Sequence, residues 1–243
     1  MEAKILPAGE TCLFVDFGEV IDLEVNARVQ SLMRALADRP FGGMKELVPT
    51  YRSLSVYFDP VTVNLSALRT RLGEELNKPF DAAQVGGREV RVPVAFGGEF
   101  GPDLGDVAGH TGLTEDEVVR RYCNSPLYCY MNGFTPGFPY LGGMDQSLTT
   151  PRLKTPREVI SANSVAIGGA QAGAYSVAGP GGWRIIGRVP YDLYDPQRRP
   201  AVAIASGLWV KFYAVTKERY AEIQAQMKSG AYRIEYAERE VGA

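Results

Sequence analysis

Residues 1–90 alternate between the hydrophobic spacing of strands and that of helices. The apolar run TCLFVDF at 11–17 predicts a strand. In residues 24–38 the apolar side chains recur at helical spacing along one face, and Asp22 is a suitable N-cap just before them. Two strands are predicted at 44–50 and 52–58, because apolar and polar positions alternate in the second and a turn separates the pair.

A helix and a strand complete this part of the chain. The helix follows the turn at Asp59-Pro60, and REVRVPVAF at 88–96 alternates as a strand should. The inner face of that helix consists of Leu65, Leu68, Leu72 and Leu76. The order strand-helix-strand-strand-helix-strand is that of a ferredoxin-like split unit. We therefore predict a small α/β domain in residues 1–90.

Residues 91–243 have a different texture. Thr114 and Glu117 form a T-x-x-E capping box, which predicts a helix running to about Cys123. Short β-type runs then alternate with long loops rich in glycine and proline, which favours a barrel or a sandwich. The runs are LYCYMN, SVAIGG, GWRIIGRV and LWVKFYAV, and a late helix is predicted at 217–228. We expect an α+β protein with a mainly β second domain at 91–243.

Charge and composition narrow the classes of partner. With 26 basic and 28 acidic residues the formal net charge is −2, so electrostatics give no support for binding to nucleic acid or to a membrane surface. The helical segment around residues 106–122 is rich in acidic residues and is better explained as a structural corner than as a DNA reader. No apolar run is long enough to span a bilayer, and MEAKILPAGE lacks a secretory core, which predicts a cytoplasmic protein.

Cysteine and histidine limit the chemistry that side chains can perform. The three cysteines are scattered and the only histidine is His110, so we expect no metal site built from this chain's own residues. No G-x-S-x-G elbow is present, and a triad would depend on His110 alone. The catalytic residues therefore stay open at this stage.

Two loops combine glycine, proline and aromatic residues as a rigid pocket rim does, although a tightly packed structural loop has the same composition. GFTPGFPYLGG at 133–143 supplies Phe134, Pro136, Gly137, Phe138 and Tyr140 as candidate substrate contacts. AGPGGWRIIGRV at 178–189 supplies Gly181, Gly182, Trp183 and Arg188. Glycine-rich turns present backbone N–H groups to anions, but no P-loop string is present.

Between these loops, TTPRLKTPREV holds cations on a segment stiffened by prolines. Arg152 and Arg157 are the candidates for binding an anion, because the guanidinium fork matches a carboxylate or a phosphate. A solvated basic loop is the alternative. Gln171 and Tyr175 are candidates for positioning an amide. The acids that adjoin these loops are Asp145, Asp192 and Asp195, and Asp195-Pro196 is equally well explained as a turn.

Several long motifs in one order carry a resemblance that spans nearly the whole chain. They are PAGE at 7–10, VPTYRSLSVYFDP at 48–60, VPVAFGGEFGPDL at 92–104, GFTPGFPYLGG at 133–143, SVAIGGAQAG at 164–173 and PGGWRIIGR at 180–188. Together they resemble the family of the 5-oxoprolinase B subunit, allophanate-hydrolase subunit 1 and the sporulation-kinase inhibitors. The chain departs from the usual family pattern at Tyr122, at Ser161-Ala162-Asn163 and at Ala172.

The resemblance implies a small ferredoxin-like α/β domain followed by a cyclophilin-like β-barrel. It also implies a partner chain of the 5-oxoprolinase C subunit or allophanate-hydrolase subunit 2 type, with a protein of the A subunit type as a third component. We expect one subunit of an ATP-dependent 5-oxoprolinase that converts 5-oxoproline to glutamate, with ATP and Mg bound by the complex. The alternatives are a carboxyltransferase subunit of a biotin-dependent urea or amide carboxylase, and a non-catalytic inhibitor of a sensor histidine kinase.

Overall fold

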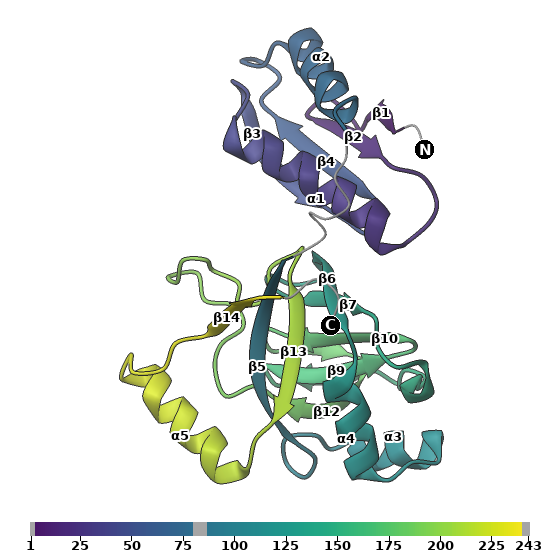
Figure 1. Ribbon diagram of the computed structural model, residues 1–243, viewed down its shortest axis with the longest axis vertical. Helices are drawn as coiled ribbons and strands as arrows, with labels where there is room; N and C mark the ends of the chain where they lie inside the picture. The colour runs from purple at the N-terminus through teal and green to yellow at the C-terminus, as the bar shows by residue number, and fades with distance from the viewer. Residues whose placement is uncertain (1–2, 80–86, 240–243) are drawn as a thin grey trace. The chain divides into compact units, whose positions relative to one another are not determined.

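The computed structural model describes residues 3–79 and 87–239, and the chain divides into two compact units at residues 86 and 87. The first unit contains β1 (Lys4–Pro7), β2 (Cys12–Asp16), α1 (Leu23–Asp38), β3 (Met44–Pro49), β4 (Ser53–Phe58) and α2 (Leu65–Leu76). The strands form an antiparallel sheet in the order β1-β2-β4-β3. Both helices pack on one face of this sheet (Figure 1).

One predicted cap, a second cap and the predicted periodicities explain this unit. The Asp22 side chain accepts a hydrogen bond from the Val25 N–H and begins α1, and the Asn64 side chain does the same for α2. Alternate residues of β2 and β4 point into a core that the inner faces of the helices complete. Leu13, Val15, Val29, Leu36, Leu54, Val56, Leu68 and Leu72 are each at most 1% exposed.

The first unit has the ferredoxin-like arrangement, but one of its strands is not the strand that the sequence predicted. The strand predicted at 88–96 as the last member of the split unit is β5 (Arg88–Phe96), and it belongs to the barrel. The edge beside β2 is filled instead by β1, from the opposite end of the unit. A single sequence pattern fixes that a segment is a strand, but the partner of a strand is decided by long-range pairing.

The second unit is a closed barrel with helices around it. The ring runs β12 (Arg184–Arg188), β9 (Ser164–Gly168), β10 (Gln171–Tyr175), β7 (Pro139–Gly142), β6 (Leu127–Asn132), β13 (Trp209–Ala214) and β5. Pairing of β12 with β5 closes it, and β14 (Glu235–Glu238) pairs with β5 outside the ring. A two-stranded ribbon of β8 (Arg157–Ile160) and β11 (Gly179–Gly181) lies apart from the ring.

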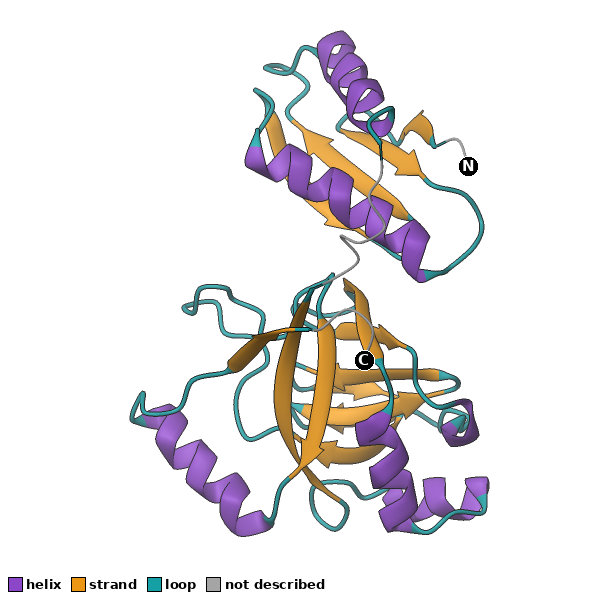
Figure 2. Ribbon diagram, in the orientation of Figure 1, coloured by secondary structure: helices purple, strands orange, loops and turns teal. Residues whose placement is uncertain are grey.

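Helices cover the barrel at its ends and sides (Figure 2). They are α3 (Leu104–Thr111), α4 (Glu115–Asn124), α5 (Lys217–Lys228) and the 3-10 turn η2 (Gln146–Leu148). The Thr114 hydroxyl accepts from the Glu117 N–H as the capping box predicts. The barrel interior is aliphatic, with the buried ring of Tyr122 stacked on Phe212 at 5.5 Å between centroids. The predicted α+β class, with a small α/β domain before a barrel, is confirmed.

Leu68 and Leu65 of α2 provide a matched test of the small core. Leu68 is 0% exposed, whereas Leu65, which was predicted on the same inner face, is 41% exposed, so the prediction is wrong for Leu65. Leu68→Ala should lower the free energy of unfolding by about 2–5 kcal/mol, because it removes buried methyl groups and leaves a cavity. Leu65→Ala should change it by no more than about 0.5 kcal/mol. Urea unfolding of both variants checks this, and equal losses would contradict the assigned helix face.

Candidate functional site

The predicted aromatic residues gather on the outer face of the barrel wall. Along β9, Val165 and Ile167 point into the barrel interior, whereas Ala166 between them points outward. The outward residues form a second buried cluster, which we call the aromatic cluster. Its members are Phe138, Ile160, Ala166, Tyr175, Trp183 and Ile185, with Tyr140 packed against them.

Phe138 is the centre of this cluster. Its ring centroid lies 5.5 Å from that of Trp183, 5.2 Å from that of Tyr175 and 4.9 Å from that of Tyr140. The contacts with Trp183 and Tyr175 are edge-to-face, the arrangement that the ring quadrupoles favour. Phe138, Tyr175 and Trp183 are at most 5% exposed. These rings therefore build a rigid platform and do not line an open pocket.

Glycines make room for the rings. A Cβ atom at Gly168 would lie 2.3 Å from the Trp183 ring, and one at Gly173 would lie 2.9 Å from it. A Cβ at Gly181 would lie 2.2 Å from the Tyr175 hydroxyl. At these positions a side chain cannot enter without moving an indole or a phenol. Gly181 was predicted as a backbone contact for a ligand, but the Tyr175 side chain occupies the space beside it.

The remaining residues of the first loop brace it. The Pro136 carbonyl accepts a 2.6 Å hydrogen bond from the Ser176 hydroxyl. Gly137 has φ +76°, and a Cβ there would lie 2.9 Å from Tyr194. Gly182 of the second loop lies beside the 153–156 segment, with Leu153 O at 3.7 Å from a Cβ built on it. Both loops are thus packed within the chain.

A smaller set of the predicted residues is accessible. Phe134 is 64% exposed in a left-handed backbone conformation with φ +64°, and its ring meets Phe138 edge-on at 5.8 Å. The Arg152 guanidinium lies over the Trp183 ring at 5.3 Å from the centroid. Tyr140 and Gln171 are partly exposed on the same wall. We call Phe134, Tyr140, Arg152 and Gln171 the aromatic face.

Arg157 has a different role from the predicted one. Its two terminal nitrogens donate to both carboxylate oxygens of Asp103, at 2.8 and 2.6 Å. Asp103 is 3% exposed, and its carboxylate also accepts a 2.7 Å bond from the Ile185 N–H. The hydrogen bond to Asp103 raises the pKa of Arg157. A bidentate pair of this kind occupies the fork that sequence reasoning offered to a ligand.

Arg188 lies at the other end of β12 from the aromatic cluster. Trp183 comes just before the strand and Arg188 ends it, so their backbones are about 16 Å apart at the rise of an extended chain. Arg188 lines a cavity of about 490 Å³ together with Asn163, Asp192, Asp195 and residues of α5. The residues predicted as one site therefore occupy two places.

The three candidate acids hold turns. Asp145 accepts from the Ser147 N–H at 2.9 Å and caps η2, and the Ser147 hydroxyl bond is the first cause of its lowered pKa. Asp192 accepts from the Asn163 side chain at 3.0 Å. Asp195 accepts from the Gln197 N–H at 2.8 Å, which confirms the predicted turn. None of these geometries sets a pair of carboxylates for acid-base work.

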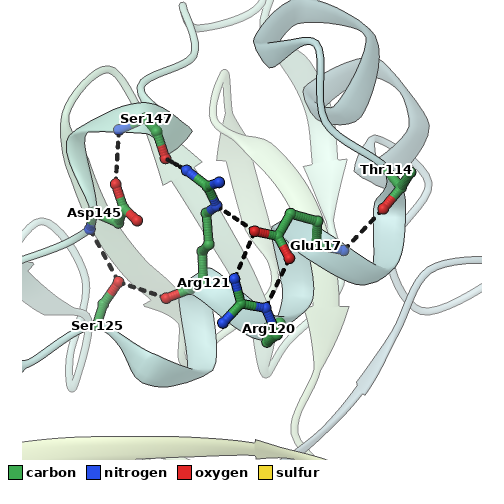
Figure 3. A network of polar contacts seen from close by, with 7 residues as sticks. All are labelled: Thr114, Glu117, Arg120, Arg121, Ser125, Asp145 and Ser147. Carbon is green, nitrogen blue, oxygen red and sulfur yellow. Dashed lines mark hydrogen bonds and ion pairs between the residues drawn. The ribbon is translucent and has the colours of Figure 1, made fainter.

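A polar network joins α4 to the turn at Asp145 (Figure 3). The Glu117 carboxylate accepts from Arg120 at 2.6 and 2.7 Å and from Arg121 at 2.7 Å. The hydrogen bonds from Arg120 and then Arg121 lower the pKa of Glu117 to about 2. Arg121 also donates to the Ser147 hydroxyl at 2.9 Å. In place of the second half of the predicted capping box, Glu117 forms ion pairs within α4, and the Arg121–Ser147 hydrogen bond links the helix to the turn.

Two features of the barrel escaped sequence reasoning. A cavity of about 900 Å³ is lined by residues of β5, β6, β13 and β14, and in it the Arg239 guanidinium lies 3.6 Å from the Trp209 ring centroid. Asn163 takes φ +64° just before β9. Asparagine is among the few residues other than glycine that accept this backbone, so its place just before a predicted strand is the available sequence signal.

Cysteines, metal-ligating groups and membrane-spanning helices add no further candidate site among the described residues. Cys12, Cys123 and Cys129 are unpaired, and burial raises the pKa of Cys123 to about 11, well above physiological pH. Within residues 3–79 and 87–239 no group of three or more metal-ligating side chains comes together. No helix of the described residues combines the length and the apolar character needed to cross a membrane.

Residues 3–204 match the family described as carboxyltransferase domain, subdomain C and D. The chain belongs to this family. It is 36% identical to the B subunit of 5-oxoprolinase from Bacillus subtilis over 227 residues, which covers 89% of this chain and 95% of that protein. With the B subunit of 5-oxoprolinase from Escherichia coli O157:H7 it shares 36% identity over 213 residues, or 86% and 95% of the two chains. The predicted family resemblance is confirmed.

Solved structures agree with the family assignment. TTHA0988 is 32% identical with a TM-score of 0.75, and the match covers 84% of this chain and 40% of that one. PH0987 of Pyrococcus horikoshii is 39% identical with a TM-score of 0.54, covering 89% of this chain and 100% of that one. The urea carboxylase of Kluyveromyces lactis shares the fold, with a TM-score of 0.73 at 20% identity over 97% of this chain and 24% of that one.

Arg157 pairs with a buried carboxylate, whereas Arg152 is an exposed cation over an aromatic ring. The free energy of unfolding of their alanine variants should distinguish these two roles. Arg157→Ala leaves the Asp103 carboxylate buried without its cation, and should lower the free energy of unfolding by about 3 kcal/mol. Arg152→Ala removes one exposed cation over an aromatic ring and should cost less than about 1 kcal/mol. Chemical denaturation measures both, and an unchanged midpoint for Arg157→Ala would contradict the buried pair and support the alternative of a solvated basic loop.

Proposed function

We propose that this chain is the B subunit of a hetero-oligomeric, ATP-dependent 5-oxoprolinase that converts 5-oxoproline to glutamate in the cytoplasm. The observation that carries the proposal is the match to proteins named as 5-oxoprolinase B subunits along 95% of their length at 36% identity. A match over nearly the whole relative supports a shared role more strongly than a shared domain does. The proposed partners are the C-type and A-type subunits of the same enzyme.

The aromatic face is what this chain offers to such a reaction. The exposed ring of Phe134 suits a flat five-membered lactam, Gln171 can hydrogen-bond its amide, and Arg152 suits the anionic part of the substrate or the nucleotide. The buried cluster beneath keeps this face rigid, as positioning of a small substrate requires. Arg157 is left out of the substrate contacts because Asp103 occupies it.

The nucleotide is assigned to the complex. The sequence has no P-loop string, and the described residues bring together no group of acids for a metal ion. Mg²⁺ that arrives with ATP binds largely through phosphates and water, so it needs few ligands from this chain. The proposal therefore requires a partner to complete the active site.

Carboxyl transfer is the second candidate, and one relative favours it. A putative urea carboxylase of Emericella nidulans is 25% identical over 276 residues, which covers 94% of this chain and 22% of that protein. The ureido ring of biotin is also a flat cyclic amide, so the aromatic face would accept it for the same reasons. The low identity and the small share of that protein place this candidate second.

The decisive experiment reconstitutes the complex. This chain, co-expressed with its C-type and A-type partners, should release glutamate from 5-oxoproline only when ATP is present. The single chain should be inactive, because its described residues provide no nucleotide motif and no acid-base pair. Carboxyl transfer to urea from a carboxybiotin donor, without glutamate, would move the assignment to the carboxylase. Turnover by the single chain would overturn the need for a partner.

Arg152 and Lys154 give a matched pair for the aromatic face, since both are exposed cations of one loop. In the reconstituted complex, Arg152→Ala should reduce kcat/KM about tenfold or more, equivalent to ~1.4 kcal/mol. Lys154→Ala should leave kcat/KM within about twofold, since that side chain is exposed and it is Arg152 that lies over the Trp183 ring. Equal effects of the two variants would point to general electrostatics instead of a site.

A further inference from the structure

The cavity at the end of β12 is walled by three segments of the barrel unit. Residues 162–163 precede β9, Arg188 ends β12 and residues 189–198 follow it, and α5 supplies Tyr220, Gln224 and Lys228. Its volume of about 490 Å³ lies within the range of small-molecule sites. The cavity lies at the opposite end of β12 from Trp183, so it is separate from the aromatic face.

Arg188 lines this cavity, and its guanidinium makes no hydrogen bond with another described residue. Its Nε is buried and has no hydrogen-bond partner among the described residues. The nearby acid Glu99 is bound by Lys217, whose hydrogen bond and charge are the main causes of its lowered pKa, with a smaller contribution from Arg188. Because that Nε is sealed from solvent, a ligand in the cavity would meet the terminal nitrogens of Arg188, which make no hydrogen bond with another described residue.

The other arginine of the cavity is fully used by the backbone. Arg198 donates to the carbonyls of Asp192, Leu193, Pro200 and Ala201 at 2.8–3.2 Å. These bonds hold the loop after β12 in place, so Arg198 shapes the wall. The contrast with Arg188, which ends a strand and has an unpaired nitrogen, marks Arg188 as the group available to a ligand.

Asn163 fixes the opposite wall. Its side chain donates to Asp192 and accepts from the Leu193 N–H, both at 3.0 Å, and its carbonyl accepts from the Val189 N–H at 2.9 Å. These bonds hold the residue at φ +64°, a left-handed conformation that asparagine accepts more readily than most residues.

The charged side chains that line the cavity favour an anionic ligand. The cavity is lined by the cations Arg188, Arg198 and Lys228 and by the acids Asp192 and Asp195, so the cations are in excess. A guanidinium binds a carboxylate through two parallel hydrogen bonds. We propose that this cavity is a binding site for the carboxylate of a small organic acid, with Arg188 as the residue that recognises it. The inference rests on the cavity alone and does not depend on the proposed function.

Calorimetric titration of the single full-length chain tests the inference. The probes are acetate, L-5-oxoproline, the neutral carboxamide of L-5-oxoproline and inorganic phosphate. The wild type should bind at least one of the two carboxylates, with the carboxamide at least tenfold weaker. Arg188→Gln should weaken carboxylate binding at least tenfold, equivalent to ~1.4 kcal/mol. Arg184→Gln is the matched control on the same strand, because its guanidinium is bound to Asp106 at 2.8 Å, and it should bind as the wild type does.

Folding is controlled separately. Arg188→Lys keeps the charge and removes the fork, so it should fold as the wild type does and bind the carboxylate at least threefold more weakly. If Arg188→Gln does not fold, this variant decides. The inference is overturned if neither carboxylate binds, if the carboxamide or phosphate binds as tightly as the acid, or if both Arg188 variants bind normally. Failure of the reconstituted complex to turn over 5-oxoproline would leave this result untouched.

Discussion

The buried carboxylate of Asp103 is the contact on which the barrel wall around β12 depends. It receives the fork of Arg157 from β8 and the N–H of Ile185 from β12, while the Asp103 N–H donates to the Ile185 carbonyl at 2.9 Å. One residue thereby connects the loop before α3, the barrel wall and the ribbon. The loop comes this close only because Gly101 has no side chain, since a Cβ there would lie 2.0 Å from the Ile186 carbonyl.

That contact sets the geometry at both ends of β12. At one end Ile185 and Trp183 enter the aromatic cluster beside Ile160 of the ribbon. At the other end Arg188 reaches the polar cavity. The two places share a strand and differ in character: one is a packed aromatic platform with a small exposed face, and the other is a polar cavity with an unpaired cationic donor. The motif that contains Trp183 and Arg188 thus reaches two separate places in the barrel unit.

Local sequence patterns predicted the elements well, because caps and periodicity are properties of neighbouring residues. Asp22, Thr114 and the alternation in 53–58 identified their helices and strand from a few positions each. The place of 88–96 was not predictable in this way, since its partners β13 and β14 come more than a hundred residues later. The pairing of β7, β9 and β10 likewise decides that Phe138 and Trp183 lie on the outer face of the barrel wall, and a local pattern does not show this.

The same limit explains the site residues. Composition indicated that Phe134, Tyr140, Arg152 and Trp183 belong together, and the structure brings them to one wall. It did not indicate that Arg157 is paired, because Asp103 lies 54 positions earlier in a different motif. Composition also did not show that Arg188 lies apart from Trp183. Their separation arises because the five residues of β12 are extended. Charge identified the cations, and their partners required the fold.

Hydrogen exchange at the Ile185 amide tests this account most directly, because that N–H donates to the Asp103 carboxylate. The comparison is between the wild type and Arg157→Lys, which keeps the charge and cannot form the bidentate pair. We expect faster exchange in residues 157–160 and 179–188, with exchange in β2 and β4 of the small unit unchanged. Unchanged protection of Ile185 and of the ribbon would contradict the central place of the Asp103–Arg157 contact.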